Sequence, residues 1–481
     1  MQEKSKFTKN LSFVLFSNLL TVIIGIVTGL LLPKYMSIEN YAYYRIFTLY
    51  LMYNGFAHLG FNDGILLKYG SFDYSDIPKV KFRTYFKFIV IFQIMLGIVA
   101  AFILLNINQD PNKKVIFLFV LFNMIIINIT SNLSISFQIT KNFKVVSFNI
   151  MLQNLILMTS ILFILLLNYT EFIFIIFAQT ITNLFIFLKY FLQSKELVFG
   201  KKMKLADVKP ELINLFSNGF PLLIGNIMGL VIFGIGRIAV ERFFTLEEFA
   251  YFSFAISLLS LVFSFISAVS NLLFPYIARI EKEKVGEYYN KIYLIVIFIT
   301  SFSLLSFFIL KYIIQNYIPQ YNKAINIALL LYPLIIYRSV INLVAVNFYK
   351  VLSLTKDYNK NNFIALIIVI SLSLGALILK LDLDGFTFVY LISFYFWLLY
   401  TDIYFSRFQN FETKKFNFLI VIISILFLFS GSLNWLYGLI IYFISLVIVL
   451  LIFMRLYYYN FIKILLRKTI LKIEKVVRNY R

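Results

Sequence analysis

The chain has 481 residues, of which 61% are hydrophobic and only 14% are charged. This balance excludes a soluble protein, which would need far more polar surface to cover its cores. The net charge is +22, with no Cys and a single His, so disulfides and thiolate metal sites are excluded and we expect no metal and no cofactor.

Apolar runs of about 20 residues recur along the whole sequence, and each is long enough to cross roughly 30 Å of hydrocarbon as a helix. They predict an all-α polytopic membrane protein with about 14 transmembrane helices. The last two runs are separated by "GSLNW", and one long broken or re-entrant helix is the alternative there. In chain order the predicted spans lie near residues 10–32, 41–67, 83–105, 115–138, 145–168, 170–190, 213–238, 246–274, 291–314, 324–349, 361–379, 385–405, 416–432 and 434–456.

The basic residues predict how these spans are oriented. Most of the 44 Lys and Arg fall in segments on the same side as the N-terminus, and such segments face the cytoplasm in membrane proteins. Both termini are therefore expected in the cytoplasm. The basic tail 457–481 is expected to lie on anionic lipid rather than to bind nucleic acid. The outer loops are short and leave no room for an outer catalytic domain.

A repeated pattern predicts the domain organisation. "KYMSIENYAYY" at 34–44 returns as "RFFTLEEFAYF" at 242–252, and the same alignment pairs Asn18 with Asn226. Further along, "TKNFK" at 140–144 returns as "TKDYN" at 355–359. Chance convergence of amphipathic loops is the alternative. The two pairs of similar segments occur in the same order in both halves of the chain. They favour parallel six-helix repeats that form two lobes around a central cavity. The predicted units are an N-lobe (1–190), a cytoplasmic basic linker (191–212), a C-lobe (213–405), two extra spans (406–456) and the tail (457–481).

Charged residues inside the spans are the strongest functional signal, because burying them in a bilayer is costly. Arg338 is nearly central in the tenth span, Arg45 is near the outer end of the second, and Arg237 is at the outer end of the seventh. Pro333 and Pro221 are expected to kink the tenth and seventh spans.

No carboxylate is found near the midplane of any span, so the cavity is predicted to be cationic and its passenger anionic. Arginine suits phosphate or pyrophosphate oxygens, since its planar fork stays charged when buried. Asn342 lies one turn from Arg338 on the same helix face and can add a hydrogen bond. The structural alternatives are that Arg338 satisfies backbone carbonyls and that Arg45 extends to the outer headgroups.

His58 and Asp63 are the candidates for ion coupling in the second span. A proton relay through His58 is one interpretation, and a His that is hydrogen-bonded to a neighbouring helix is the favoured alternative. Asp63 lies toward the inner end of the same span. Glycines within the first and seventh spans follow no strand, so they do not predict a nucleotide-binding loop.

Two blocks of sequence resemble the bacterial polysaccharide-unit flippases, the O-antigen and capsule transporters. One is "LLLPKYMSIENYAYYRIFTLY" followed by "HLGFNDGILLKYG"; the other is "LFSNGFPLLIGNIMGLVIFGIGRIAVERFFTLEEFAYFSFA" followed by "NLLFPYIAR". The resemblance implies a two-lobed, alternating-access carrier of undecaprenyl-pyrophosphate-linked oligosaccharides in the bacterial inner membrane, working beside a polysaccharide polymerase and glycosyltransferases. One departure is Gly236, where the family commonly has Asp before the arginine that corresponds to Arg237.

Four other functions compete with this interpretation. A peptidoglycan-precursor flippase also carries a pyrophosphate cargo, whereas a multidrug or cation antiporter of the same superfamily is expected to hold a carboxylate inside the membrane. A membrane polysaccharide polymerase would need catalytic groups in a large outer loop. An assembly scaffold would leave Arg338 unexplained.

Overall fold

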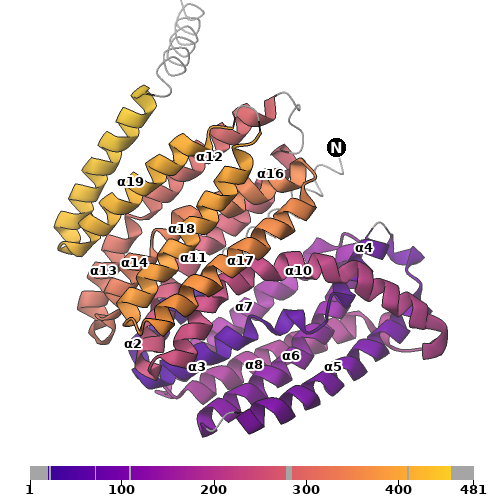
Figure 1. Cartoon of the computed structure of the whole chain (residues 1–481). Coiled ribbons are helices and arrows are strands. Elements are labelled where there is room, and N and C mark those ends of the chain that lie inside the picture. Colours follow the sequence, from indigo (N-terminus) through magenta and orange to yellow (C-terminus); the bar gives the residue numbers. More distant parts are fainter. Residues whose placement is uncertain are drawn as a thin grey trace, which may run out of the picture.

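The computed structural model describes residue 20 and residues 23–70, 72–107, 110–277, 284–408 and 411–456. Helices make up almost all of this part of the chain, and it contains no strand. Figure 1 shows the helices gathered in two groups, with α3–α8 on one side and α11–α19 on the other, and with α10 between them. This arrangement confirms the predicted all-α class.

The first group follows a helical stretch, Ile23–Tyr35, which contains the π-helical turn η1 (Val27–Leu31) and ends as α2 (Leu32–Tyr35). The helices of the first group and of the connection to α10 are α3 (Ile38–Leu51), α4 (Phe61–Tyr69), α5 (Lys79–Ile107), α6 (Pro111–Ile139), α7 (Phe143–Leu166), α8 (Phe172–Gln193) and α9 (Lys195–Val198).

The long helix α10 (Leu205–Phe243) begins the second half of the chain, eight residues earlier than the predicted span near 213–238. The helices after it are α11 (Leu246–Ile277), α12 (Val285–Ser303), α13 (Ser306–Tyr317), α14 (Ala324–Leu331), α15 (Leu334–Ser339), η6 (Val340–Ala345), α16 (Val346–Val351), α17 (Thr355–Ile378), α18 (Leu383–Phe405), α19 (Thr413–Ser432) and a last helix over Trp435–Leu456. The "GSLNW" segment therefore separates two helices.

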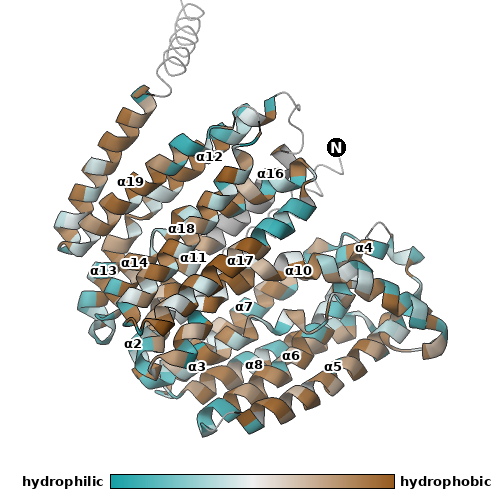
Figure 2. Ribbon diagram, viewed as in Figure 1, coloured by the Kyte–Doolittle hydropathy of each residue, from teal (hydrophilic) through white to brown (hydrophobic). Residues whose placement is uncertain are grey.

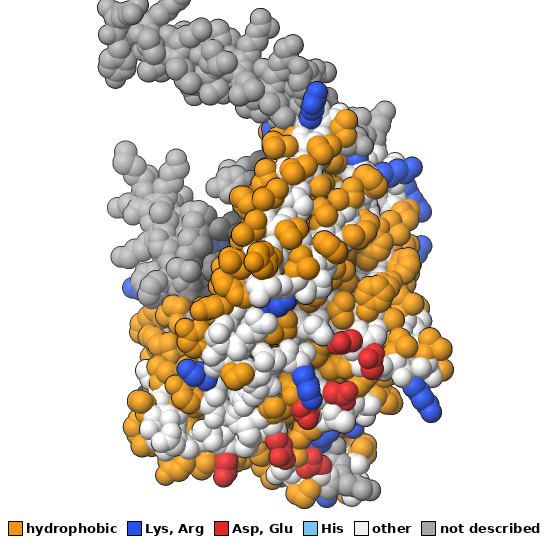
Figure 3. Space-filling view, turned by 90° about the vertical axis from the view of Figure 1, so that its left-hand side faces the viewer, with side chains coloured by type: hydrophobic (Ala, Val, Ile, Leu, Met, Phe, Trp, Pro, Cys, Tyr) orange, Lys and Arg blue, Asp and Glu red, His pale blue; other side chains and the backbone are white. Residues whose placement is uncertain are grey.

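Eleven helices of the described chain are long and apolar enough to cross a membrane, and α10 adds a twelfth as a pair of segments bent by 50°. Figure 2 shows hydrophobic residues along the middle of the helices and hydrophilic ones near their ends, and Figure 3 shows a largely hydrophobic face with Asp and Glu gathered toward one end. The protein is a multi-pass membrane protein. The total of about 14 spans remains a prediction, because the first predicted span lies mostly outside the described residues.

The second predicted span, 41–67, is broken into α3, the short 3-10 turn η2 (Asn54–Phe56) and α4. Broken backbone inside a membrane needs hydrogen-bond donors for its freed carbonyls. Gln93 of α5 donates to the carbonyl of Ala57 at 2.9 Å, and Asn128 of α6 donates to the carbonyl of Asn54 at 2.9 Å. The amide side chains of two neighbouring helices thus stabilise the break.

α4 and α10 pack backbone to backbone. A Cβ on Gly64 would lie 2.0 Å from the carbonyl oxygen of Leu215, and a Cβ on Gly219 would lie 1.9 Å from that of Gly60. Gly60 also has φ +84, a left-handed conformation that glycine adopts most easily. Glycine is therefore required at this crossing, because any side chain would push the two helices apart.

At the opposite end of the molecule the two groups of helices interlock. Gln320, just before α14, donates to the carbonyl of Pro33 at 2.5 Å, and the Tyr41 and Tyr321 rings lie edge to face at 5.7 Å. α3 and η1 both pack directly against α11. By the predicted topology this interlocked end is the outer one.

Candidate functional site

A cavity of about 620 Å³ lies between α10 and the helices α15–α18. The residues that line it come from seven elements: Leu67 of α4; Asn218, Pro221, Leu222, Gly225, Gly229 and Leu230 of α10; Arg338 of α15; Asn342 of η6; Val346, Tyr349 and Lys350 of α16; Tyr358 and Asn359 of α17; and Trp397 of α18. We call it the α10 cavity. Its described lining contains Arg and Lys but no Asp or Glu.

The Arg338 guanidinium contacts two aromatic rings that lie edge to face with each other. Its Cζ lies 4.0 Å from the ring centroid of Phe233 on α10 and 4.3 Å from that of Phe263 on α11. Aromatic faces attract a cation by about 1–2 kcal/mol when water is excluded, but they do not neutralise its charge or accept its N–H groups in strong hydrogen bonds. No ion pair or hydrogen bond to Arg338 is found within the described residues. The arginine is therefore oriented by these two cation–π contacts and keeps its donors available to the cavity.

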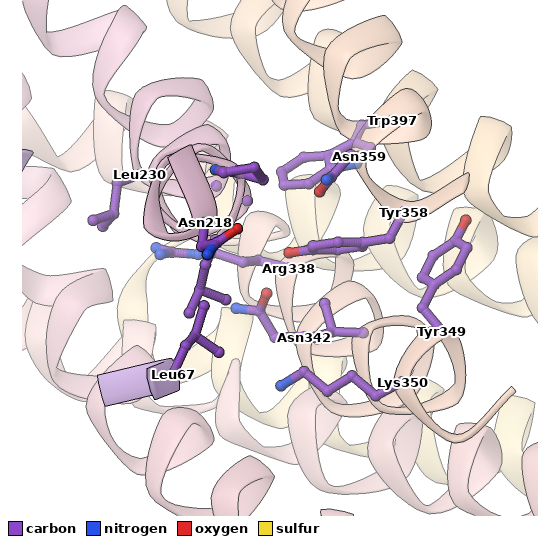
Figure 4. A pocket seen from close by; sticks show the side chains of 15 residues that line it. Leu67, Asn218, Leu230, Arg338, Asn342, Tyr349, Lys350, Tyr358, Asn359 and Trp397 are labelled. Carbon is purple, nitrogen blue, oxygen red and sulfur yellow. The ribbon is translucent and has the colours of Figure 1, made fainter. Parts of the chain in front are cut away.

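Arg338, Asn342 and Lys350 share one face because the helix changes its pitch between them. Residues four apart drift by about 40° around an α-helix of 3.6 residues per turn. The π-helical turn η6 (Val340–Ala345) has more residues per turn, so residues four apart rotate by less there, and this offsets the drift. Figure 4 shows the polar ends of the three side chains directed to the same side, where Leu67 and Leu230 lie.

The helix carrying Arg338 is broken just before it, as Pro333 predicted. α14 ends at Leu331, and α15 begins at Leu334 with Pro333 as its N-cap. α10 opposite is bent by 50° between Gly225 and Ile227, shortly after Pro221. Both walls of the cavity are thus interrupted helices.

Arg45 and Arg237 do not line the α10 cavity. Both are buried where α3, α10 and α11 meet, and we call this region the arginine seam. Arg237 donates to the carbonyl oxygen of Arg45 at 3.0 Å, and Arg45 donates to that of Ser253 at 3.3 Å. Arg45 therefore does not extend to the surface, and the structure brings two of the three predicted arginines together but not the third.

The absence of a carboxylate beside Arg237 has a packing reason. A Cβ on Gly236 would lie 2.7 Å from the ring of Tyr390 on α18. The Tyr390 hydroxyl donates to the carbonyl oxygen of Phe233 at 2.8 Å, which fixes the ring in this place. Tyr390 therefore occupies the space that an aspartate side chain at position 236 would need.

His58 and Asp63 lie near each other on the broken part of the second span. The His58 Nε2 is 3.9 Å from the Asp63 Oδ2, and the His58 Nδ1 accepts a hydrogen bond from the Gly60 N–H at 3.1 Å. The Asp63 Oδ2 is buried without a hydrogen-bond partner among the described residues. The two coupling candidates thus form a pair outside the lining of the α10 cavity.

Two predicted residues cannot be placed. Asn18 and the side chain of Asn226 lie outside the described part of the structure. Sequence reasoning also missed Lys350, Tyr358, Asn359, Asn218 and Trp397, which all line the cavity. A signal existed only for Lys350, because Arg338, Asn342, Val346 and Lys350 follow one another at intervals of four.

Comparison with known proteins identifies the family. The family model described as "Polysaccharide biosynthesis protein" matches residues 7–281, more than half of the chain. The chain belongs to this family. The match confirms the resemblance that the two sequence blocks indicated. A search of curated protein sequences found no match.

Eight chains of solved structures match the fold of this polysaccharide biosynthesis protein. One of them is "Lipid II flippase MurJ, inward closed conformation", with a TM-score of 0.69 and 16% sequence identity. The match covers 93% of this chain and 99% of that one. At this identity the similarity establishes a shared fold.

Proposed function

We propose that this protein is a flippase that moves undecaprenyl-pyrophosphate-linked oligosaccharide repeat units from the cytoplasmic to the outer leaflet of the bacterial inner membrane, for surface polysaccharide assembly. The observation that carries the proposal is the Arg338 guanidinium, in contact with Phe233 and Phe263 beside a cavity with no acidic residue in its described lining. A half-buried guanidinium with no counter-ion among the described residues favours an anionic ligand, and its fork suits the oxygens of a pyrophosphate.

The positions of the other polar groups suit a cargo that enters from the cytoplasmic side. Lys350 is exposed on α16, nearer the predicted inner end, and Arg338 lies deeper along the same face. A pyrophosphate would meet Lys350 first and Arg338 next, with Asn342 between them. The opposite end is closed by the contacts of Gln320 and Tyr321 with the start of the chain's first half.

Transport by alternating access requires two units that move against each other, and we propose the two predicted six-helix repeats for this role. In the alignment of 34–44 with 242–252, Arg45 corresponds to Ser253, and these two residues are hydrogen-bonded. A contact between equivalent positions is expected at the axis of a two-fold arrangement. The arginine seam would then lie on the axis between the N-lobe and the C-lobe.

The polyprenyl tail is proposed to stay outside the α10 cavity, between helices or in the bilayer, while the polar head crosses. A long hydrocarbon chain does not favour a cationic, hydrated path, whereas the head needs one. Burying Arg338 without an anion costs on the order of 2.5–3.5 kcal/mol on insertion scales, so the empty cavity is expected to hold water. The basic tail 457–481, outside the described residues, is proposed to contact anionic lipids.

A peptidoglycan-precursor flippase remains the main alternative, since the similar solved structure is that of a lipid II flippase. A cation-coupled antiporter is less favoured, because neither Asp63 nor Asp402 lines the α10 cavity. Asp402 is also engaged elsewhere. It accepts hydrogen bonds from Tyr293 and Asn417, each at 2.7 Å, between α12, α18 and α19.

The proposal is tested in cells of the source organism by replacing the gene with variants and measuring surface polysaccharide and membrane protein level. Arg338→Ala should abolish or strongly reduce surface polysaccharide at near-normal protein level. Arg338→Lys should restore only part of the surface polysaccharide, because lysine returns the charge without the bidentate fork. Arg407→Ala, an exposed arginine outside the cavity, is the matched control and should have no effect.

Full surface polysaccharide in the Arg338→Ala strain would contradict the proposal. Deletion of the gene separates the two cargoes. Loss of surface polysaccharide with normal growth supports the repeat-unit flippase, whereas arrest of cell-wall growth and lysis would assign the peptidoglycan precursor instead.

A further inference from the structure

A second cavity of about 280 Å³, lined by apolar and uncharged polar side chains, lies within the first group of helices, between α6, α7 and α8. We call it the α7 cavity. Its lining shares no residue with that of the α10 cavity. The polar side chains that matter here are Ser131 of α6, Asn149 and Gln153 of α7, and Asn183 of α8. The described lining contains amides and hydroxyls but no charged residue.

The amides of the α7 cavity are held in place by one another. Gln153 donates to the Asn183 Oδ1 at 2.8 Å, and Asn183 donates to the Asn123 Oδ1 at 2.7 Å. Asn149 donates to the Gln193 Oε1 at 3.1 Å. Such a chain of amides fixes the direction of each side chain, so the cavity is a preorganised polar site.

One acceptor in this cavity is left unsatisfied. Asn149 is fully buried, and its Oδ1 has no hydrogen-bond partner within the described part of the chain. A buried acceptor without a donor costs about 1–3 kcal/mol. This oxygen is closed off in the described conformation, so the Asn149 side chain must rotate before a donor in the cavity can reach it. The chemistry favours a neutral group with hydroxyl or amide donors, since nothing in the described lining compensates a charge.

By the predicted repeat, the three helices around the α7 cavity correspond to the walls of the α10 cavity other than α10 and α4. The sequence echo of 140–144 and 355–359 pairs the α6–α7 connection with the α16–α17 connection. The packing agrees, because α6, α7 and α8 contact one another pairwise, as do α16 with α17, α17 with α18 and α14 with α18. Both cavities are lined by the predicted inner halves of their helices. They therefore lie at a similar depth, one cationic and the other neutral.

We propose that the α7 cavity is a sugar-binding subsite, which takes one neutral, hydroxyl- or acetamido-bearing sugar residue of the cargo. The inference rests on the proposed function, in which the α10 cavity takes the pyrophosphate. A volume of about 280 Å³ is near the lower limit of small-ligand sites and suits a single sugar rather than an oligosaccharide. Sugar hydroxyls supply the donors that Asn149 lacks, and they accept from Gln153 and Ser131. The subsite would make the first group of helices responsible for cargo specificity.

The test uses the full chain in lipid nanodiscs, with N-acetylglucosamine as the sugar probe and inorganic pyrophosphate as the anion probe. Saturation-transfer NMR reports sugar binding through the acetamido methyl group, and isothermal calorimetry reports pyrophosphate. Asn149→Leu should weaken the sugar signal at least threefold and leave the pyrophosphate affinity within twofold of wild type. Ser131→Trp, which fills the cavity from α6, should do the same and covers the case in which Asn149→Leu does not fold.

Thr159→Val, on α7 but outside the cavity lining, is the matched control and should bind both probes normally. Arg338→Ala should lose pyrophosphate and keep the sugar signal. An unchanged sugar signal in both Asn149→Leu and Ser131→Trp would overturn the subsite, as would its absence in the wild type. Unchanged pyrophosphate binding in Arg338→Ala would instead contradict the proposed function, so the two failures are distinguishable.

Discussion

Three arginines of the described helices, Arg45, Arg237 and Arg338, were predicted to line the cavity, and they occupy two different environments. At the arginine seam, the buried Arg45 and Arg237 each donate to a backbone carbonyl across a helix interface. In the α10 cavity, Arg338 contacts two Phe rings and has no carbonyl or carboxylate partner among the described residues. Charge within a span therefore does not by itself mark a cavity residue: Arg45 and Arg237 each donate to backbone outside the cavity lining, although the Nε of each is buried without a hydrogen-bond partner among the described residues.

The largest expected effect is that of Arg338→Glu on pyrophosphate binding. Reversing the charge places a carboxylate where the anion should sit, and like charges at short range repel strongly. Calorimetry with the protein in nanodiscs should show at least a hundredfold loss of affinity, with an unchanged melting temperature. Arg407→Glu is the control, and an equal loss there would mean that only net charge matters.

Substitutions in the arginine seam should lower the stability of the protein rather than its affinity for pyrophosphate. Arg45→Ala removes a buried donor to Ser253 and leaves a void, so we expect the free energy of unfolding to fall by about 1–3 kcal/mol. Arg45→Met keeps most of the side-chain volume and should lower the free energy of unfolding by less. Thermal unfolding checks both. If Arg45→Ala lowered the affinity for pyrophosphate as much as Arg338→Ala does, Arg45 would belong to the binding site. The arginine seam and the α10 cavity would then not differ in function.

Lys350→Ala should weaken pyrophosphate binding by no more than about fivefold. Lys350 is exposed, and an exposed charge contributes only about 0.2–1 kcal/mol because water screens it. The same calorimetric titration measures the effect, with Lys360→Ala as the exposed control on α17. A loss as large as that of Arg338→Ala would show that Lys350 is as well shielded from water as the arginine.

The smallest expected effect is the salt dependence that separates the two regions. Raising the ionic strength from about 0.1 M to about 1 M shortens the screening length from about 10 Å to about 3 Å. Pyrophosphate affinity should therefore fall several-fold, measured by calorimetry at each salt concentration. The difference in melting temperature between wild type and Arg45→Ala should stay constant, since the seam is closed to water. Equal salt dependence of both quantities would contradict the comparison.

The sequence predicted more of the fold than of the site. Composition and apolar runs predicted the all-α membrane class, and Pro333 predicted the break before Arg338. They did not predict the break in the second span, because it depends on Gln93 and Asn128 of other helices. Arg338 and Asn342 were expected to line a cavity, and the described structure places both there. Tyr358 and Trp397 carried no signal, since nothing in their local sequence distinguishes a cavity wall from a packed core.

The sequence by itself determined that this chain is a membrane protein, because no soluble fold can bury so many apolar runs. It also determined that arginines lie within the membrane spans. Only the tertiary structure decided which arginine lines the cavity. Whether a guanidinium donates to backbone or faces a cavity depends on the atoms around it, and those atoms come from helices far away in the chain: Ser253 for Arg45, and Phe233 and Phe263 for Arg338.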